Sequence, residues 1–166
     1  MRAELQAVLH GAGRARRRVR IGNQSCPIAR CGMEHGGVEY CVQCPEYPCP
    51  RYEGIDSCDS FITHLHKKRD LEKLRQVGGT DYAAEQVEKR HILDRLLAGY
   101  NDGRKKTLFC LSVNLLELED LRTILEQADR EAGELSKKEK AAYMSGLLQA
   151  CATENGIVLK LRRKVT

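Results

Sequence analysis

Six of the eight cysteines in this chain lie between Cys26 and Cys58, in the order C-x4-C-x9-C-x2-C-x4-C-x8-C. Five of them fall within 24 residues of turn-rich sequence, namely Cys26, Cys31, Cys41, Cys44 and Cys49. Thiolates are ligands for zinc and iron, and they are also the nucleophiles of redox proteins. We therefore expect any chemistry of this chain to reside in its first third.

The spacing of these cysteines favours a zinc site. Zinc takes four ligands in a tetrahedral arrangement, and a C-x2-C turn such as Cys41 to Cys44 directs two sulfurs to one side of the backbone. Cys26 and Cys31 form the expected second pair. Cys49 is a fifth thiol, either in reserve or replacing one of the four. Because five thiolates are available, the expected site is closed and structural rather than open and catalytic.

Other interpretations of the same residues stay open. His35 lies between the two pairs and is a candidate nitrogen ligand, and Cys58 is a further candidate thiol. An iron–sulfur cluster is the main alternative, although the C-x2-C-x2-C run of bacterial ferredoxins is missing. Neither a thioredoxin-type redox pair nor a disulfide framework is favoured, because the chain shows no export signal and no strand–helix unit after Cys44.

Composition and charge set the remaining bounds. The chain has 166 residues, 42% of them hydrophobic and 31% charged, which is typical of one soluble domain with an aliphatic core. No apolar run is long enough to span a membrane, so we expect a cytoplasmic protein. The net charge of +5 comes from residues 1–25, which hold six arginines and a single acidic residue.

This basic N-terminal arm is a candidate nucleic-acid interface. Its arginines could neutralise backbone phosphates, or they could form a solvated tail with no partner. The residues concerned are Arg14, Arg16, Arg17, Arg18 and Arg20.

Helical periodicity begins near residue 60 and continues almost to the end. A helix is expected from about Phe61 to the Gly78-Gly79 stop, and another from a Thr80 cap to Gly99. Two more are expected from about residue 104 to 115 and from 118 to 128. Ser136 and Glu139 form a capping-box pattern ahead of a fifth helix that closes at Gly156. Residues 157–162 alternate in polarity and predict one short strand.

These patterns predict a mainly α protein with four to five helices, an N-terminal cysteine-rich zinc-binding knuckle and a short C-terminal strand. The expected organisation is a basic arm over residues 1–25, the knuckle over 26–59 and a helical body over 60–166. A further short helix is expected over residues 3–10, and at most one within the knuckle. Knuckle and body are expected to form one compact domain.

The cysteine segment resembles a known family. It contains CPIARC at residues 26–31 and YCVQCPEYPC at residues 40–49. Both match the signature C-P-I-x-x-C followed by C-x-x-C-x-x-[FY]-P-C of the prokaryotic family called domain of unknown function 3795. We expect the resemblance to cover most of residues 26–130. It implies a small, cytoplasmic, metal-binding protein without an assigned reaction. Relatives usually carry extra cysteines just upstream, which residues 16–24 lack, so at most one metal ion is expected.

Motifs of common enzymes are missing from the sequence. It contains no G-x-S-x-G, no phosphate-binding glycine loop and no H-E-x-x-H. We therefore favour a protein without catalytic activity, in which a structural zinc cluster supports an interaction module for an unidentified partner. The alternatives are an iron–sulfur or redox protein that uses the same cysteines and a nucleic-acid binder that uses the arginine arm.

Overall fold

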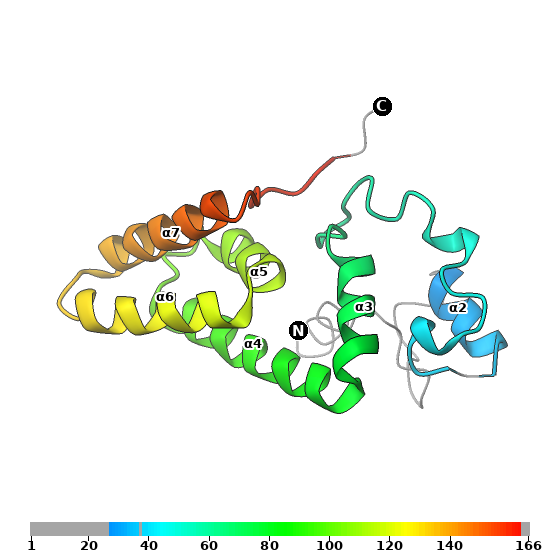
Figure 1. Cartoon of the computed structure of the whole chain (residues 1–166). Helices are drawn as coiled ribbons and strands as arrows, with labels where there is room; N and C mark the ends of the chain where they lie inside the picture. The colour runs from blue at the N-terminus through cyan, green and yellow to red at the C-terminus, as the bar shows by residue number, and fades with distance from the viewer. Residues whose placement is uncertain (1–26, 37, 164–166) are drawn as a thin grey trace.

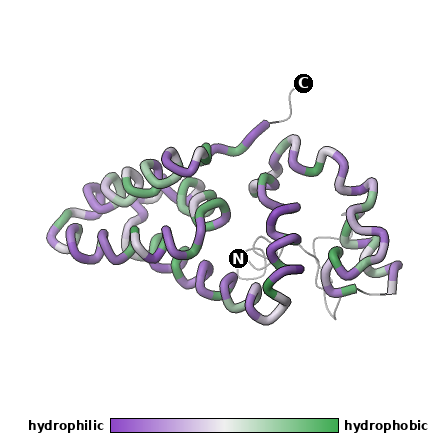
Figure 2. The backbone as a smooth tube through the Cα atoms, viewed as in Figure 1, coloured by the Kyte–Doolittle hydropathy of each residue, from purple (hydrophilic) through white to green (hydrophobic). Residues whose placement is uncertain are grey.

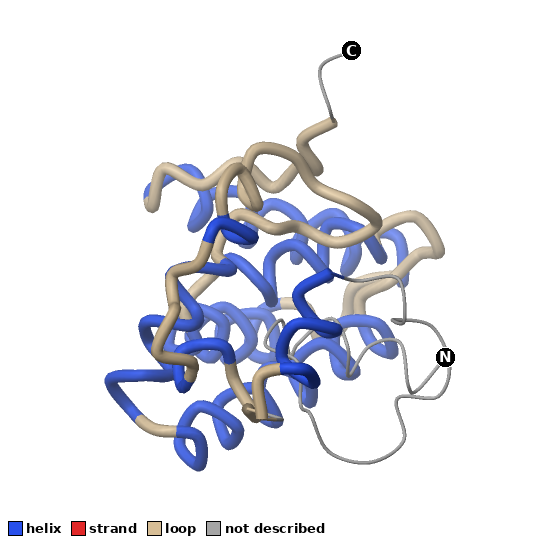
Figure 3. Tube along the Cα trace, turned by 90° about the vertical axis from the view of Figure 1, so that its right-hand side faces the viewer, coloured by secondary structure: helices blue, strands red, loops and turns tan. Residues whose placement is uncertain are grey.

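The structure is a computed structural model that describes residues 27–36 and 38–163. The predicted helix over residues 3–10, the basic arm over 1–25 and Cys26 all lie outside the described residues. Within them the chain forms six α-helices and two short 3-10 helices, and no strand (Figures 1 and 3). In chain order these are α2 (Pro27–Glu34), η1 (Cys41–Gln43), η2 (Pro50–Tyr52), α3 (Lys67–Val77), α4 (Gly79–Gly99), α5 (Lys106–Leu115), α6 (Leu118–Glu131) and α7 (Lys137–Glu154). The prediction of a mainly helical protein is confirmed.

Helices α4 to α7 form a bundle around the larger of two hydrophobic cores. Apolar and hydrophilic residues are interleaved along each helix, so that the apolar ones can meet inside (Figure 2). Phe109 on α5 is completely buried at the centre of this core. Its other buried members are Ile92, Leu93, Leu96, Tyr100, Val113, Leu116, Leu121, Ile124, Leu125, Ala128, Ala132, Met144, Leu148 and Ala152.

The second core is smaller and joins the cysteine segment to α3 and α4. It consists of five buried residues, which are Tyr40, Tyr52, Leu71, Leu74 and Tyr82. Three of the five are tyrosines, so much of this core is built from rings that carry a polar atom. Since η1 packs on α3 and α3 packs on α4, this core connects the cysteine segment to the bundle.

Several helix ends follow from local sequence. The Ser136 side chain accepts a hydrogen bond from the backbone N–H of Glu139, while the Glu139 carboxylate accepts one from the backbone N–H of Ser136. The capping box predicted at the start of α7 is therefore confirmed. Gly78 has a φ of 85° between α3 and α4, a value that a side chain would disfavour. Helix α4 ends at Gly99, as predicted.

The start of α3 differs from the prediction, because residues 61–66 form turns and the helix begins only at Lys67. The Asp59 carboxylate accepts a hydrogen bond from the backbone N–H of His64 at 2.8 Å, which holds this segment in a turn. Phe61, expected on the apolar face of a helix, is instead 82% exposed. Thr80 also does not act as the cap of α4, which begins at Gly79.

The predicted C-terminal strand over residues 157–162 is wrong. A strand needs a neighbouring strand to pair with, and this segment instead packs Ile157 and Leu159 against the bundle core and hydrogen-bonds to Asp59 near its end. The backbone N–H of Asp59 donates to the Arg162 carbonyl at 2.9 Å, and the Arg162 N–H donates to the Asp59 carboxylate at 2.7 Å. The tail is therefore an irregular segment fixed near its end by Asp59.

None of the described helices combines the length and the apolar character that a bilayer crossing requires.

Candidate functional site

Four of the five predicted ligand cysteines line one small pocket in the described structure. Cys31 lies in α2, Cys41 opens η1, Cys44 follows η1, and Cys49 precedes η2. The space between them is about 20 Å³, close to the room that one water molecule needs. Four thiols from three separate segments therefore line a space of about the size of one ion.

Consecutive tight turns position three of these cysteines. The N–H of Cys44 donates to the Cys41 carbonyl at 3.0 Å, and the N–H of Tyr47 donates to the Cys44 carbonyl at 3.1 Å. The N–H of Tyr52 then donates to the Cys49 carbonyl at 2.9 Å. Each turn begins at a cysteine, and all three cysteines line the same pocket.

His35 lies at the edge of this pocket, next to Cys31. Its Nδ1 is 3.4 Å from the Cys31 sulfur and 3.0 Å from the Cys31 carbonyl oxygen. Its Nε2 is 3.8 Å from the exposed carboxylate of Glu46. The candidate nitrogen ligand is therefore within reach of one thiol and is itself exposed to solvent.

The pKa of the Cys41 thiol is affected by the other thiols that line the pocket. Burial raises the pKa of the Cys41 thiol, the neighbouring Tyr52 hydroxyl opposes that shift, and the thiols of Cys49, Cys31 and Cys44 raise the pKa further. A cation in the pocket would reverse this balance, because it stabilises the thiolate form. Arg51, which also lines the pocket, is a positive charge already in place.

The Tyr52 hydroxyl is the one buried side-chain polar atom without a hydrogen-bond partner in the described part of the chain. Tyr52 is only 4% exposed, lines the same pocket and packs edge to face on Tyr47 with ring centroids 5.1 Å apart. Burial and the nearby Cys41 raise the pKa of this hydroxyl far above its usual range, so it keeps its proton. It is therefore a hydrogen-bond donor facing the sulfurs.

The ligand geometry itself is incomplete in the described residues. Over residues 27–36 and 38–163, no three histidine, cysteine, aspartate or glutamate side chains converge closely enough to hold a metal ion. Cys26, the predicted partner of Cys31, lies outside the described residues, as do Arg14, Arg16, Arg17, Arg18 and Arg20. The described cysteines form no disulfide with one another. The zinc-binding knuckle is thus not supported as an assembled site.

Three further cysteines lie away from this pocket. Cys110 and Cys151 are half-buried and pack against the bundle core, as their positions in apolar helical stretches predict. Cys58 is half-buried in the turn before Asp59 and does not line the pocket.

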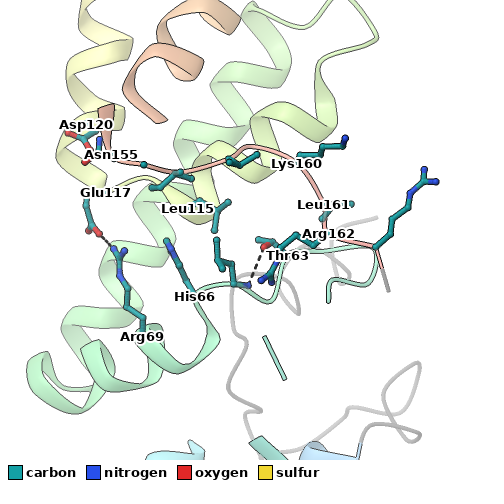
Figure 4. Close-up of a pocket in the computed structure, with 15 residues that line it drawn as sticks. Thr63, His66, Arg69, Leu115, Glu117, Asp120, Asn155, Lys160, Leu161 and Arg162 are labelled. Carbon is teal, nitrogen blue, oxygen red and sulfur yellow. Dashed lines mark hydrogen bonds and ion pairs between the residues drawn. The ribbon is translucent and has the colours of Figure 1, made fainter. Parts of the chain in front are cut away.

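A second, much larger hollow was missed by sequence reasoning. This tail groove has a volume of about 1200 Å³ and is lined by residues from segments 63–69, 115–120 and 155–163. Figure 4 shows Arg69 and Glu117 at one end, Lys160 and Arg162 at the other, and His66 and Leu115 between them. The alternating pattern of residues 157–162 was the available signal, but it was assigned to a strand.

Comparison with known proteins adds one finding. Residues 4–54 match the family model described as "Protein of unknown function (DUF3795)". The resemblance expected from the cysteine motif is confirmed, but the match covers residues 4–54 rather than most of 26–130. The description of this family assigns it no function. No curated protein and no solved structure matches the chain.

Proposed function

We propose that the cysteine segment binds one zinc ion through thiolates and that this ion stabilises the fold of the segment as part of a protein-interaction module. The ligands are drawn from Cys31, Cys41, Cys44 and Cys49, with Cys26 as the additional thiol. The observation that carries the proposal is that four thiols from three separate segments line one ion-sized space.

The chemistry of the donor set fits a soft, borderline cation. Thiols surround the space, and no carboxylate of the described chain lines it. Zinc prefers such sulfur ligands, whereas calcium and magnesium require oxygen. A zinc ion with four thiolates carries a net charge of −2, and Arg51 and the Tyr52 hydroxyl are placed to stabilise that charge.

Binding requires rotations of the side chains rather than a new fold. The four thiols are each half-buried, and their backbone turns are already formed. A change of χ1 at a cysteine moves its sulfur without moving the chain. The ion then replaces the apolar core that a segment rich in glycine and proline cannot build.

The orphaned Tyr52 hydroxyl is a second, independent support. A buried donor without a partner costs about 1–3 kcal/mol. A thiolate at Cys41 would accept its proton in a charge-assisted hydrogen bond and remove that cost. Hydrogen bonds of this kind from neighbouring groups tune the thiolates of metal sites.

Elemental analysis of protein purified in reducing, metal-free buffer and then exposed to zinc tests the proposal. We expect about one zinc per chain, and loss of zinc in Cys41→Ser and Cys44→Ser. Cys151→Ser is the matched control, since that thiol lies on α7 and should leave the zinc content unchanged. A native protein that contains iron and inorganic sulfide would replace this proposal with the iron–sulfur alternative, and a protein that takes up no metal would overturn it.

Tyr52→Phe separates the hydroxyl from the ligands. We expect cobalt(II) to bind this variant in place of zinc with a shifted sulfur-to-metal charge-transfer band, because the thiolate loses its hydrogen bond. An identical band in both proteins would show that the hydroxyl does not contact the bound thiolates.

A further inference from the structure

The tail groove combines an apolar floor with unpaired positive charge, and neither feature contributes to the cysteine site. The aliphatic part of the lining, which forms the floor, includes Leu115, Ile157 and Leu161, while Leu65 is 36% exposed. At the rim, Val158 is 72% exposed, which is unusual for a large hydrophobic side chain with no partner. A surface of this kind marks a binding site more often than an incidental exposure.

Positively charged side chains outnumber carboxylates in the groove. Four cationic side chains line it against two carboxylates, those of Glu117 and Asp120. Arg69 is already paired with Glu117, and Arg162 donates to Asp59 at 2.8 Å. Lys160 and Arg163 are exposed and form no ion pair with any carboxylate of the described chain. Lys160 and Arg163 outweigh the remaining carboxylate of the groove, that of Asp120, so one net positive charge is left for a ligand.

The pKa of the His66 imidazole is affected by the same excess of positive charge in the groove. Burial, and after it the charges of Arg69, Lys89 and Arg162, together lower the pKa of this imidazole to about 4. No carboxylate counteracts them to a comparable degree. The positive potential at the floor would therefore stabilise a negatively charged group of a ligand. Such a group would lie beside the neutral imidazole of His66, which could take up a proton.

We propose that the tail groove binds an acidic peptide segment of a partner protein, with its carboxylates beside Lys160, Arg163 and His66 and its apolar side chains on the aliphatic floor. A volume of about 1200 Å³ exceeds that of pockets for single small molecules, which are about 300–1000 Å³, and so favours a stretch of chain. Residues of the tail between Asn155 and Arg163 supply more than half of the lining, so a bound stretch of chain would lie beside the tail.

The aliphatic floor favours a peptide over a nucleic acid as the occupant of the groove. Proteins that bind single strands stack successive bases on several aromatic rings, whereas the lining of this groove includes no Phe, Tyr or Trp and only one imidazole, that of His66. The arginine-rich N-terminal arm is also excluded as the occupant, since its charge has the same sign as that of the groove. This inference rests on the proposed role as an interaction module but does not require the zinc ion.

Selection from a displayed library of random peptides, with the full chain immobilised, tests the proposal. We expect the enriched peptides to combine Asp or Glu with Leu, Ile or Val. One selected peptide, labelled with a fluorophore, should then bind the double variant Lys160→Glu/Arg163→Glu at least about tenfold more weakly. Arg162 is left unchanged in this variant because it holds the tail to Asp59.

The matched control is Lys137→Glu/Lys138→Glu, which changes the net charge equally. Both lysines are exposed in the first turn of α7, and helix length separates that end from the tail by about 27 Å. Acidic residues are also tolerated at a helix N-terminus, so this variant should fold and bind as the native protein does.

A second readout is the titration of His66 by NMR. A ligand carboxylate next to the imidazole should raise the pKa of His66 by at least about one pH unit, an effect that unspecific attraction to the surface would not produce. An unchanged His66 titration, a library without acidic enrichment, or equal binding by the two double variants would overturn the proposal.

Displacement of the peptide by a single-stranded RNA oligonucleotide, with the same dependence on Lys160 and Arg163, would also overturn it and assign the groove to nucleic acid. Zinc content measured on the same samples keeps the two proposals apart. A chain that lacks zinc but selects acidic peptides contradicts only the metal site.

Discussion

The cysteine segment and the helical bundle differ in how much apolar surface they bury. The bundle buries fifteen residues in one aliphatic core, whereas the segment shares with α3 and α4 a core of five, three of them tyrosines. The bundle therefore derives its stability from apolar burial, which is independent of any ligand. The segment instead combines turns, half-buried thiols and a buried hydroxyl without a hydrogen-bond partner, features that agree with the metal-stabilised segment proposed above.

The largest expected effect tests the bundle side of this comparison. Phe109→Ala removes a fully buried ring at the centre of the core and should lower the free energy of unfolding by about 4 kcal/mol. Chemical denaturation followed by far-UV circular dichroism measures this change. Val87→Ala is the control, because Val87 on α4 is 57% exposed and should cost less than about 0.5 kcal/mol. A small loss for Phe109→Ala would mean that the bundle is not the stable part.

Removal of zinc tests the other side. At a zinc concentration of about 100 times its dissociation constant, the ion should stabilise the cysteine segment by about 3 kcal/mol. Hydrogen exchange with and without a chelator should show faster exchange at the backbone amides of Cys44 and Tyr52, because both lie in the segment. The amides of α5 should change little. Equal acceleration in both regions would contradict their independence.

Asp59 is the contact that ties the chain before α3 to the C-terminal tail. Its side chain is only 1% exposed. Burial alone would raise the pKa of this carboxyl, but hydrogen bonds from Arg162 and from the backbone of His64 hold it well below its usual range. Asp59→Asn should cost about 2 kcal/mol at neutral pH, which thermal unfolding measures.

The pH dependence of this contact has a defined sign. Because the folded-state pKa of Asp59 lies below the unfolded value, its contribution is present above about pH 4 and is lost as the pH falls further. The difference between the native protein and Asp59→Asn should therefore shrink in acid. A constant difference from pH 7 to pH 3 would show that the carboxylate charge is not what matters.

The smallest effect concerns Asp70, where α3 faces α4. Burial raises the pKa of Asp70 to about 6 from an ordinary value of 3.8, although Lys89, Arg69 and Lys73 oppose the shift. A folded-state pKa above the unfolded one means that ionisation destabilises the fold, so stability should rise as the pH falls from about 6 towards 4. Asp70→Asn should gain about 1 kcal/mol at pH 7 and lose this advantage near pH 4. If Asp70→Asn instead lowered the stability at pH 7, the ionised Asp70 carboxylate would be shown to stabilise the fold through its interactions with these cations.

Local signals in the sequence predicted much of the helical body. The Ser136 and Glu139 pair placed the start of α7, and Gly78 and Gly99 placed the ends of α3 and α4, because caps and left-handed residues act within one turn of chain. The start of α3 and the tail were missed because each depends on a contact of Asp59. The start of α3 depends on Asp59, whose carboxylate accepts a hydrogen bond from the backbone N–H of His64. The position of the tail depends on the contact between Asp59 and Arg162, which are 103 residues apart.

The candidate site divides in the same way. The spacing of the cysteines predicted which thiols would be neighbours, and Cys31, Cys41, Cys44 and Cys49 do line one pocket. The spacing of the cysteines did not identify Tyr52 as part of the site. Its hydroxyl is a candidate hydrogen-bond donor to the thiolates because the fold buries it without a hydrogen-bond partner. The tail groove was also missed, since the alternation of residues 157–162 marks only one of the three distant segments that line it.

The sequence by itself determined the helical class, most of the helix ends and the cluster of thiols, because periodicity, caps and short spacings act over a few residues. The tertiary structure alone decided where the tail lies, which polar groups are buried and which charges remain unpaired. Those properties depend on what each residue meets across the fold, and an amino-acid pattern carries no information about a neighbour a hundred positions away.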